Sequence, residues 1–76
     1  MDNRLLAKLK NFRLKAFRMV AQHLSFRKAA EYLSLLQPAV TLQIKVLEDD
    51  LDVPLFDNAP NGVSLTSQGP ILLRYA

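Results

Sequence analysis

The fold of this chain is decided by residues 25–51, SFRKAAEYLSLLQPAVTLQIKVLEDDL. After Ser25, apolar residues recur at three- and four-residue steps as far as Leu33, the spacing that lines one face of a helix. The Ser25 hydroxyl is well placed to accept a hydrogen bond from a free backbone N–H at the start of this helix. The pattern therefore predicts a short helix of about two turns.

A longer helix is expected over 37–51, after a connection of only a few residues. Pro38 suits its first turn, because the missing N–H would have no intrahelical partner there. Apolar residues at i, i+4, i+7 and i+11 predict a buried stripe. These residues are Val40, Ile44, Leu47 and Leu51. At about 100° per residue, the side chains that point away are Pro38, Leu42, Lys45 and Asp49, with Thr41 and Val46 on the flanks.

The residues before this stretch predict another amphipathic helix. Its apolar residues also recur at helical spacing, and basic residues fill the remaining positions. The apolar set is Leu5, Leu9, Phe12, Ala16, Phe17, Val20 and Ala21. Three helices in a row therefore share enough apolar surface for one small core.

The residues after this stretch predict a hairpin and a last helix. Two short strands, 55–57 and 63–65, flank the turn-forming residues 59–62, in which Pro60 presets one backbone angle and Gly62 tolerates the left-handed conformation. Thr66 is a candidate cap for a helix through Tyr75, with Pro70 tolerated near its start.

Composition limits the possible functions. The chain has 76 residues, half of them hydrophobic, which is enough for one domain, and it has no cysteine for disulfides or thiolate chemistry. Residues 1–47 hold nine Lys or Arg against two acidic residues, a net charge of +7, whereas residues 48–76 hold one against five, a net charge of −4. This asymmetry favours a polyanionic partner, either nucleic acid or an anionic membrane surface, although a charged run is also common on a merely solvated face.

Two short helices joined by a tight turn, followed by a hairpin, predict a mainly α, winged helix-turn-helix fold. The second helix of such a unit enters the major groove of double-stranded DNA. There the Gln37 amide can pair with adenine, Thr41 can bond a base or touch a thymine methyl, and Lys45 can reach a guanine or a phosphate. Residues at the start of the preceding helix would lie near the DNA backbone. These residues are Ser25, Arg27 and Lys28.

From Phe17 onward the chain resembles the N-terminal domain of LysR-type transcriptional regulators. The similarity covers about four-fifths of the chain and rests on many positions in one order. These are Phe17, Val20-Ala21, Ser25-Phe26, Ala29-Ala30, Leu33, Gln37-Pro38-Ala39-Val40-Thr41, Gln43-Ile44, Leu47-Glu48, Leu51, Leu55-Phe56, Gly62, Leu65-Thr66 and Gly69. The resemblance implies that Gln37, Pro38, Ala39, Thr41 and Leu42 contact bases. It also implies that residues of the hairpin, or wing, here Asn58 and Asn61, reach the adjacent minor groove or the DNA backbone.

The chain departs from the family at informative positions. Leu36 stands where the family has a Ser or Thr cap, and Leu42 stands where a polar residue is common. Asp52 replaces a helix-ending Gly, so we expect the left-handed turn there to form less easily. Asn58 and Asn61 replace basic wing residues, so we expect a weaker salt dependence of binding.

The resemblance also implies an organisation of the chain. Residues 1–11 would be an N-terminal extension, as an extra helical turn or a loose tail, residues 12–66 the winged helix-turn-helix, and residues 67–76 the start of a linker and dimerisation helix. An effector-binding domain would follow, so we expect a piece of a longer regulator. Such regulators are cytoplasmic, associate with the nucleoid, form homodimers or tetramers through the linker helix, and bind a small-molecule effector only through the C-terminal domain. No cofactor and no membrane partner are expected.

Two other classes of function compete with DNA binding. Residues 4–20 form a basic amphipathic pattern of the kind found at membrane surfaces or in protein grooves. An enzyme is disfavoured, because His23 is the single histidine and no nucleophile has a partner base by motif. Asp49, Asp50 and Asp52 lack the ligand spacing of a calcium loop and are interpreted as a solvated acidic patch.

Overall fold

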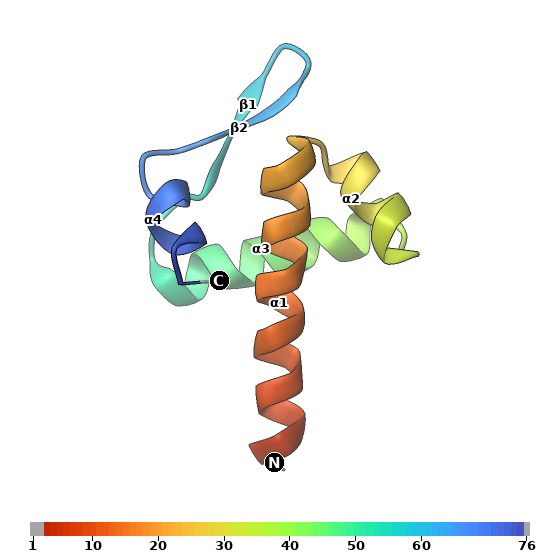
Figure 1. Ribbon diagram of the computed structural model, residues 1–76, viewed down its shortest axis with the longest axis vertical. Helices are drawn as coiled ribbons and strands as arrows, with labels where there is room; N and C mark the ends of the chain where they lie inside the picture. Colours follow the sequence, from red (N-terminus) through yellow and green to blue (C-terminus); the bar gives the residue numbers. More distant parts are fainter. Residues whose placement is uncertain (1–2, 76) are drawn as a thin grey trace.

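The computed structural model describes residues 3–75, and residues 1, 2 and 76 lie outside the described part. Three helices come first, then two strands, then a short helix (Figure 1). The elements are α1 (Asn3–His23), α2 (Phe26–Leu33), α3 (Gln37–Leu51), β1 (Phe56–Ala59), β2 (Gly62–Leu65) and α4 (Gly69–Leu73). The predicted mainly α fold with a two-stranded hairpin is therefore confirmed.

One core forms where the first three helices meet. α3 crosses α1, α2 packs against both, and the hairpin stands beside the C-terminal end of α1 (Figure 1). The core residues are Ala16, Phe17, Val20, Ala29, Ala30, Val40, Ile44, Leu47 and Leu55. Phe56 of β1 joins the hairpin to this core, because its ring lies 5.6 Å from that of Phe17 and 5.9 Å from that of Phe26.

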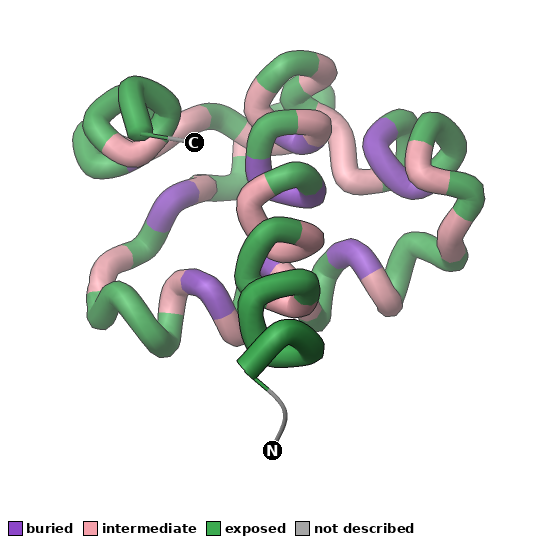
Figure 2. The backbone as a smooth tube through the Cα atoms, turned by 60° about the horizontal axis from the view of Figure 1, so that its bottom comes forward, coloured by how far each residue is buried: buried purple, intermediate pink, exposed green. Residues whose placement is uncertain are grey.

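The first turns of α1 extend away from this core. The helix is continuous from Asn3, so residues 3–11 are helical, and they are exposed along almost their whole length (Figure 2). Leu5 is 52% exposed, and its predicted place on a buried face is wrong. The reason is geometric: the helical periodicity continues beyond the point at which α2 and α3 supply a packing partner. No described helix is both long and apolar enough to cross a bilayer.

The helix ends mostly follow the sequence signals. The Ser25 hydroxyl accepts a hydrogen bond from the Lys28 N–H at 3.2 Å, which confirms the predicted cap of α2. Leu36 is the N-cap of α3 and supplies no side-chain acceptor, and Pro38 lies in the first turn. Asp52 still adopts the left-handed conformation, with φ of 57°, and ends α3. A short polar side chain tolerates this region better than most residues do.

The hairpin is slightly longer than predicted. Phe56 pairs with Leu65 and Ala59 pairs with Gly62, which leaves Pro60 and Asn61 as the turn. Leu55 was predicted to lie in the first strand, but it precedes β1 and is fully buried. Its backbone N–H is bonded to a side chain of α3 rather than to the other strand, which accounts for the shift.

The C-terminal ends of two helices differ from the predictions. Leu51 was expected in the buried stripe of α3, but it is 43% exposed, because the last turn of α3 lies beyond the crossing with α1. The last helix begins at Gly69, next to Pro70 as the sequence allows, but it ends at Leu73 rather than Tyr75. The predicted cap Thr66 accepts a hydrogen bond from the Gln68 N–H at 3.3 Å, so it lies before the first turn of α4 and not at its N-cap. Residues 67 and 68 form a turn before Pro70. After Leu73, the N–H groups of Arg74 and Tyr75 donate to carbonyl oxygens three residues earlier, so the helix ends in a tighter turn.

The uncapped start of α3 generates a stability prediction. Replacing Leu36, which is 80% exposed, by Ser adds a side-chain acceptor beside the Ala39 N–H, which already donates to the Leu36 carbonyl oxygen at 3.0 Å. We expect Leu36→Ser to raise the free energy of unfolding by about 0.5–1 kcal/mol, the low end of cap effects because Pro38 has no N–H to offer. Ser25→Ala removes the side-chain acceptor that caps α2 and should lower the free energy of unfolding by about 1 kcal/mol. Urea denaturation measures both, and a Leu36→Ser variant no more stable than the original chain would contradict the prediction.

Candidate nucleic-acid interface

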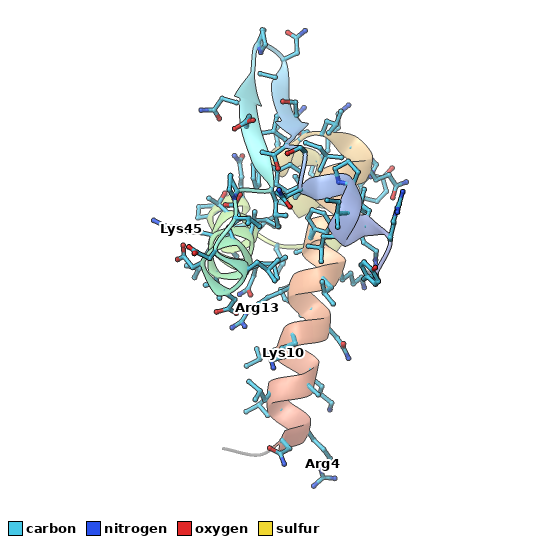
Figure 3. All side chains as sticks on the ribbon, turned by 90° about the vertical axis from the view of Figure 1, so that its left-hand side faces the viewer. Arg4, Lys10, Arg13 and Lys45 are labelled. Carbon is cyan, nitrogen blue, oxygen red and sulfur yellow. The ribbon has the colours of Figure 1, made fainter. Side chains whose placement is uncertain are left out.

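The outward face of α3 carries most of the predicted base-contacting residues. Val40, Ile44 and Leu47 are buried, which turns the opposite face of the helix to solvent. The exposed residues line a shallow depression of about 530 Å³, and they are Gln37, Pro38, Thr41, Leu42 and Lys45. Lys45 extends from the side of α3 that faces away from α1 (Figure 3). The predicted orientation of α3 is confirmed, with Leu51 as the exception described above.

Two residues of this face differ in detail from the prediction. Ala39 is half-buried and does not line the depression, because it lies toward the core side of the first turn. The Thr41 hydroxyl donates a hydrogen bond to the Gln37 carbonyl oxygen at 3.1 Å. Its single proton is therefore used within the helix, so that Thr41 offers its surroundings an acceptor and a methyl group.

The start of α2 holds the predicted backbone-contacting residues. Ser25 is half-buried and occupied as a cap, whereas Arg27 and Lys28 are exposed. The Arg27 guanidinium lies 3.1 Å from the Glu31 carboxylate, one turn later on the same helix. Both side chains are largely exposed, and such surface pairs contribute little, so the pair does not prevent Arg27 from turning toward a phosphate.

Arg13 fixes α1 against α3, a role that the sequence did not indicate. Its Nε donates a hydrogen bond to the Gln43 side chain at 3.3 Å, and its guanidinium lies 3.6 Å from the Asp50 carboxylate. Arg13 lies between the two helices (Figure 3). Among the basic residues of α1, nothing in the helical periodicity distinguishes this one, so only the crossing of the helices could identify it.

Glu48 fixes the hairpin to α3, a role that the helical periodicity also does not indicate. Its carboxylate accepts hydrogen bonds from the N–H groups of Leu55 and Phe56, at 2.6 and 3.3 Å. One signal was present, because an acidic residue in the last turn of a helix is disfavoured by the helix dipole and so calls for another partner. The first strand is therefore held directly by the helix that carries the candidate reading face.

Two further hydrogen bonds hold β2 and the residue that follows it. The Val63 N–H donates to the Leu24 carbonyl oxygen at 3.3 Å, and the Thr66 hydroxyl donates to the Pro54 carbonyl oxygen at 2.6 Å. A Cβ atom at Gly62 would lie 2.5 Å from the Leu24 oxygen, so this close approach requires glycine. The predicted wing residues Asn58 and Asn61 remain exposed on the strand and at the turn.

The structure also describes the surroundings of His23 and of the acidic residues weighed as a metal site. The His23 ring stacks on the Tyr32 ring, with centroids 4.5 Å apart and planes inclined by 14°, and so joins the end of α1 to α2. Within residues 3–75 no three His, Asp or Glu side chains come together in a group that could hold a metal ion.

An exposed face with hydrogen-bonding side chains on the second helix of a helix-turn-helix, with a hairpin fixed beside it, defines a winged helix-turn-helix DNA-binding domain. Residues 12–70 match the model of the bacterial regulatory helix-turn-helix proteins of the lysR family. The chain belongs to the LysR family, which consists of transcriptional regulators and not of enzymes.

Named relatives agree with this membership. The chain is 47% identical over 62 residues to a probable RuBisCO transcriptional regulator of Guillardia theta, which covers 82% of this chain and 20% of that protein. It is 46% identical over 63 residues to the HTH-type transcriptional regulator YxjO of Bacillus subtilis, covering 83% of this chain and 22% of that one. The chain therefore spans about a fifth of the length of the curated relatives it matches.

Solved structures have the same fold. The DNA-binding domain of CbnR in complex with DNA superposes with a TM-score of 0.79 at 36% identity, over 83% of this chain and 72% of that one. The DNA-binding domain of BenM in complex with benA site 1 DNA gives a TM-score of 0.77 at 33% identity, over 83% and 71%. A LysR-family regulator from Eggerthella lenta gives 0.79 at 38% identity, over 84% and 91%.

The two hydrogen bonds accepted by Glu48 generate a second prediction. Glu48→Ala leaves the partly buried N–H groups of Leu55 and Phe56 without this acceptor, so we expect the free energy of unfolding to fall by about 1–3 kcal/mol. The adjacent exposed Asp49 provides the matched control, and Asp49→Ala should change it by less than about 0.5 kcal/mol. Equal effects of the two substitutions, measured by urea denaturation, would contradict the assigned role.

Proposed function

We propose that the chain binds double-stranded DNA sequence-specifically as the reading domain of a LysR-type transcriptional regulator, with α3 in the major groove. The observation that carries the proposal is the orientation of α3. Its apolar stripe is buried against α1 and α2, and its first two turns present Gln37, Thr41 and Lys45 to solvent.

The proposed base contacts follow from the chemistry of each side chain. The Gln37 amide pairs with adenine N6 and N7, and Lys45 reaches guanine or a phosphate. The Thr41 oxygen, whose proton is bonded to the Gln37 carbonyl, accepts from an amino group of adenine or cytosine. Pro38, Ala39 and Leu42 make apolar contacts at the same surface.

The proposed backbone contacts come from the start of α2 and from the hairpin. Ser25, Arg27 and Lys28 lie where free N–H groups at a helix N-terminus also favour a phosphate. Asn58 and Asn61 are exposed on the hairpin and offer hydrogen bonds without positive charge. Asp57, also exposed on β1, adds a negative charge to this wing, so the electrostatic attraction to DNA comes from the helices.

The organisation of the whole regulator is part of the proposal. Residues 12–66 form the DNA-binding domain, residues 1–11 extend it, and α4 leads into a linker helix through which homodimers or tetramers form. A C-terminal domain binds a small-molecule effector, and the protein acts in the cytoplasm at the nucleoid. The support is family membership together with the relatives, which are about five times as long as the matched region.

One observation favours a second candidate function, binding to an anionic membrane surface. Leu5 and Leu6 are 52% and 37% exposed on the basic first turns of α1. Against it, Phe17 and Val20, further along the apolar face of α1, are buried in the core and are not available to lipid. Co-sedimentation with anionic vesicles, without retention of duplex DNA, would favour this alternative over DNA binding.

Selection of bound duplexes from a random pool tests the proposed reading residues. We expect the chain to select a defined sequence, and Gln37→Ala and Thr41→Ala each to relax the preference at a different base pair. A lost bidentate contact costs about 1–3 kcal/mol of discrimination. Asn3→Ala, at the far end of α1, is the control and should leave the selected sequence unchanged. Two reading variants that select the same bases as the original chain would contradict the assignment.

The uncharged wing generates a prediction on salt dependence. Each phosphate neutralised by a Lys adds about 0.9 to the slope of log K against log salt concentration. Asn58→Lys and Asn61→Lys should therefore each tighten binding at low salt and steepen the slope by about that amount. Asn58→Gln, which adds no charge, should leave the slope unchanged. Unchanged slopes for both Lys variants, in titrations on the selected duplex, would show that the wing does not lie at the backbone.

A further inference from the structure

The candidate reading face of α3 has an apolar strip along its middle. Leu42 is 57% exposed, and Pro38 lies one turn before it on the same side of the helix. Thr41, next to Leu42, turns its hydroxyl proton back to the Gln37 carbonyl and leaves its methyl group at the surface. Besides the Thr41 oxygen, which can only accept, the polar side chains that can reach a base edge lie at the two ends of the depression, at Gln37 and Lys45.

The exposure of Leu42 has no explanation within the domain. The core takes its α3 residues from the opposite face, and Leu42 is not among the apolar residues that pack against the core. An exposed leucine at the centre of a surface that enters a groove gains free energy only if the groove offers it an apolar partner. In the major groove of DNA, the 5-methyl group of thymine is the apolar feature of the base edges.

We propose that Leu42 determines specificity for thymine by packing on its 5-methyl group, which rests on the proposed function of α3. The selection works in two ways. The methyl group of thymine gains apolar burial against the Leu42 side chain. At the same place, cytosine would lose the water bound to its amino group, and guanine would lose the water bound to its O6 and N7 acceptors. Leu42 cannot replace those hydrogen bonds.

This inference separates Leu42 from the residues around it. Gln37 and Lys45 discriminate by hydrogen bonds, so their effect does not depend on the methyl group of a pyrimidine. Leu42 discriminates by a group that uracil lacks and 5-methylcytosine carries. The contribution of Leu42 can therefore be measured by changing one methyl group of the DNA while every Watson–Crick pair is kept.

The experiment replaces the thymines of the selected duplex by deoxyuridine, one at a time. With the original chain, the loss of the contacted methyl group should weaken binding about fourfold at one position, as expected for one buried methyl-sized group. With Leu42→Ala the same replacement should have almost no effect, whereas Leu42→Met, which keeps an apolar side chain of similar size, should retain most of it. In a duplex with cytosine at that position, 5-methylcytosine should restore part of the affinity for the original chain and not for Leu42→Ala.

The outcomes distinguish this inference from the proposed function. Failure of the original chain to select any sequence would overturn the proposed function and the inference with it. Sequence-specific binding without a deoxyuridine effect at any position would overturn the inference and leave the proposed function intact. A deoxyuridine effect of equal size in Leu42→Ala would also overturn it, because another residue would then contact the methyl group. Thermal unfolding of the Leu42 variants, which should resemble that of the original chain, excludes a loss of folding as the cause.

Discussion

The burial of one face of α3 is the constraint on which the rest of this structure depends. Val40, Ile44 and Leu47 pack into the core formed with α1 and α2, and this leaves the helix a single orientation about its own axis. Because a helix cannot bury one face without turning the other to solvent, the same three residues determine which side chains a partner can meet. The candidate reading face is thus a consequence of the core.

The second constraint is the attachment of the hairpin. A two-stranded hairpin has little stability of its own, so its position depends on contacts outside the sheet. The Glu48 carboxylate holds the start of β1, the Leu24 carbonyl holds β2, and Phe56 places a ring against the core. Helix α3 and the hairpin therefore form one rigid surface, as a protein that contacts a groove and the flanking backbone together requires.

Charge and apolar surface are divided between different parts of this surface. The basic residues lie mainly on α1 and at the start of α2, while the hairpin bears Asp57 and uncharged polar residues. Along α3, the longer hydrogen-bonding side chains, Gln37 and Lys45, stand at the ends of the exposed face, with Thr41 and Leu42 between them. Under the proposed function, general attraction to a polyanion and discrimination between bases come from separate residues, and each can change without altering the core.

The sequence by itself determined the helices, the hairpin and the exposed face of α3, because periodicity, caps and turn residues act over a few neighbouring positions. It also placed the chain in its family, through residues that alternate between core and reading face. Only the tertiary structure decided how far each apolar stripe is covered, and Leu5 and Leu51 are exposed because the helices cross and then diverge. The contacts of Arg13 and Glu48 could also be identified only from the fold. Arg13 joins α1 to α3 and Glu48 joins α3 to the hairpin, and the sequence pattern does not say which of these elements lie next to each other.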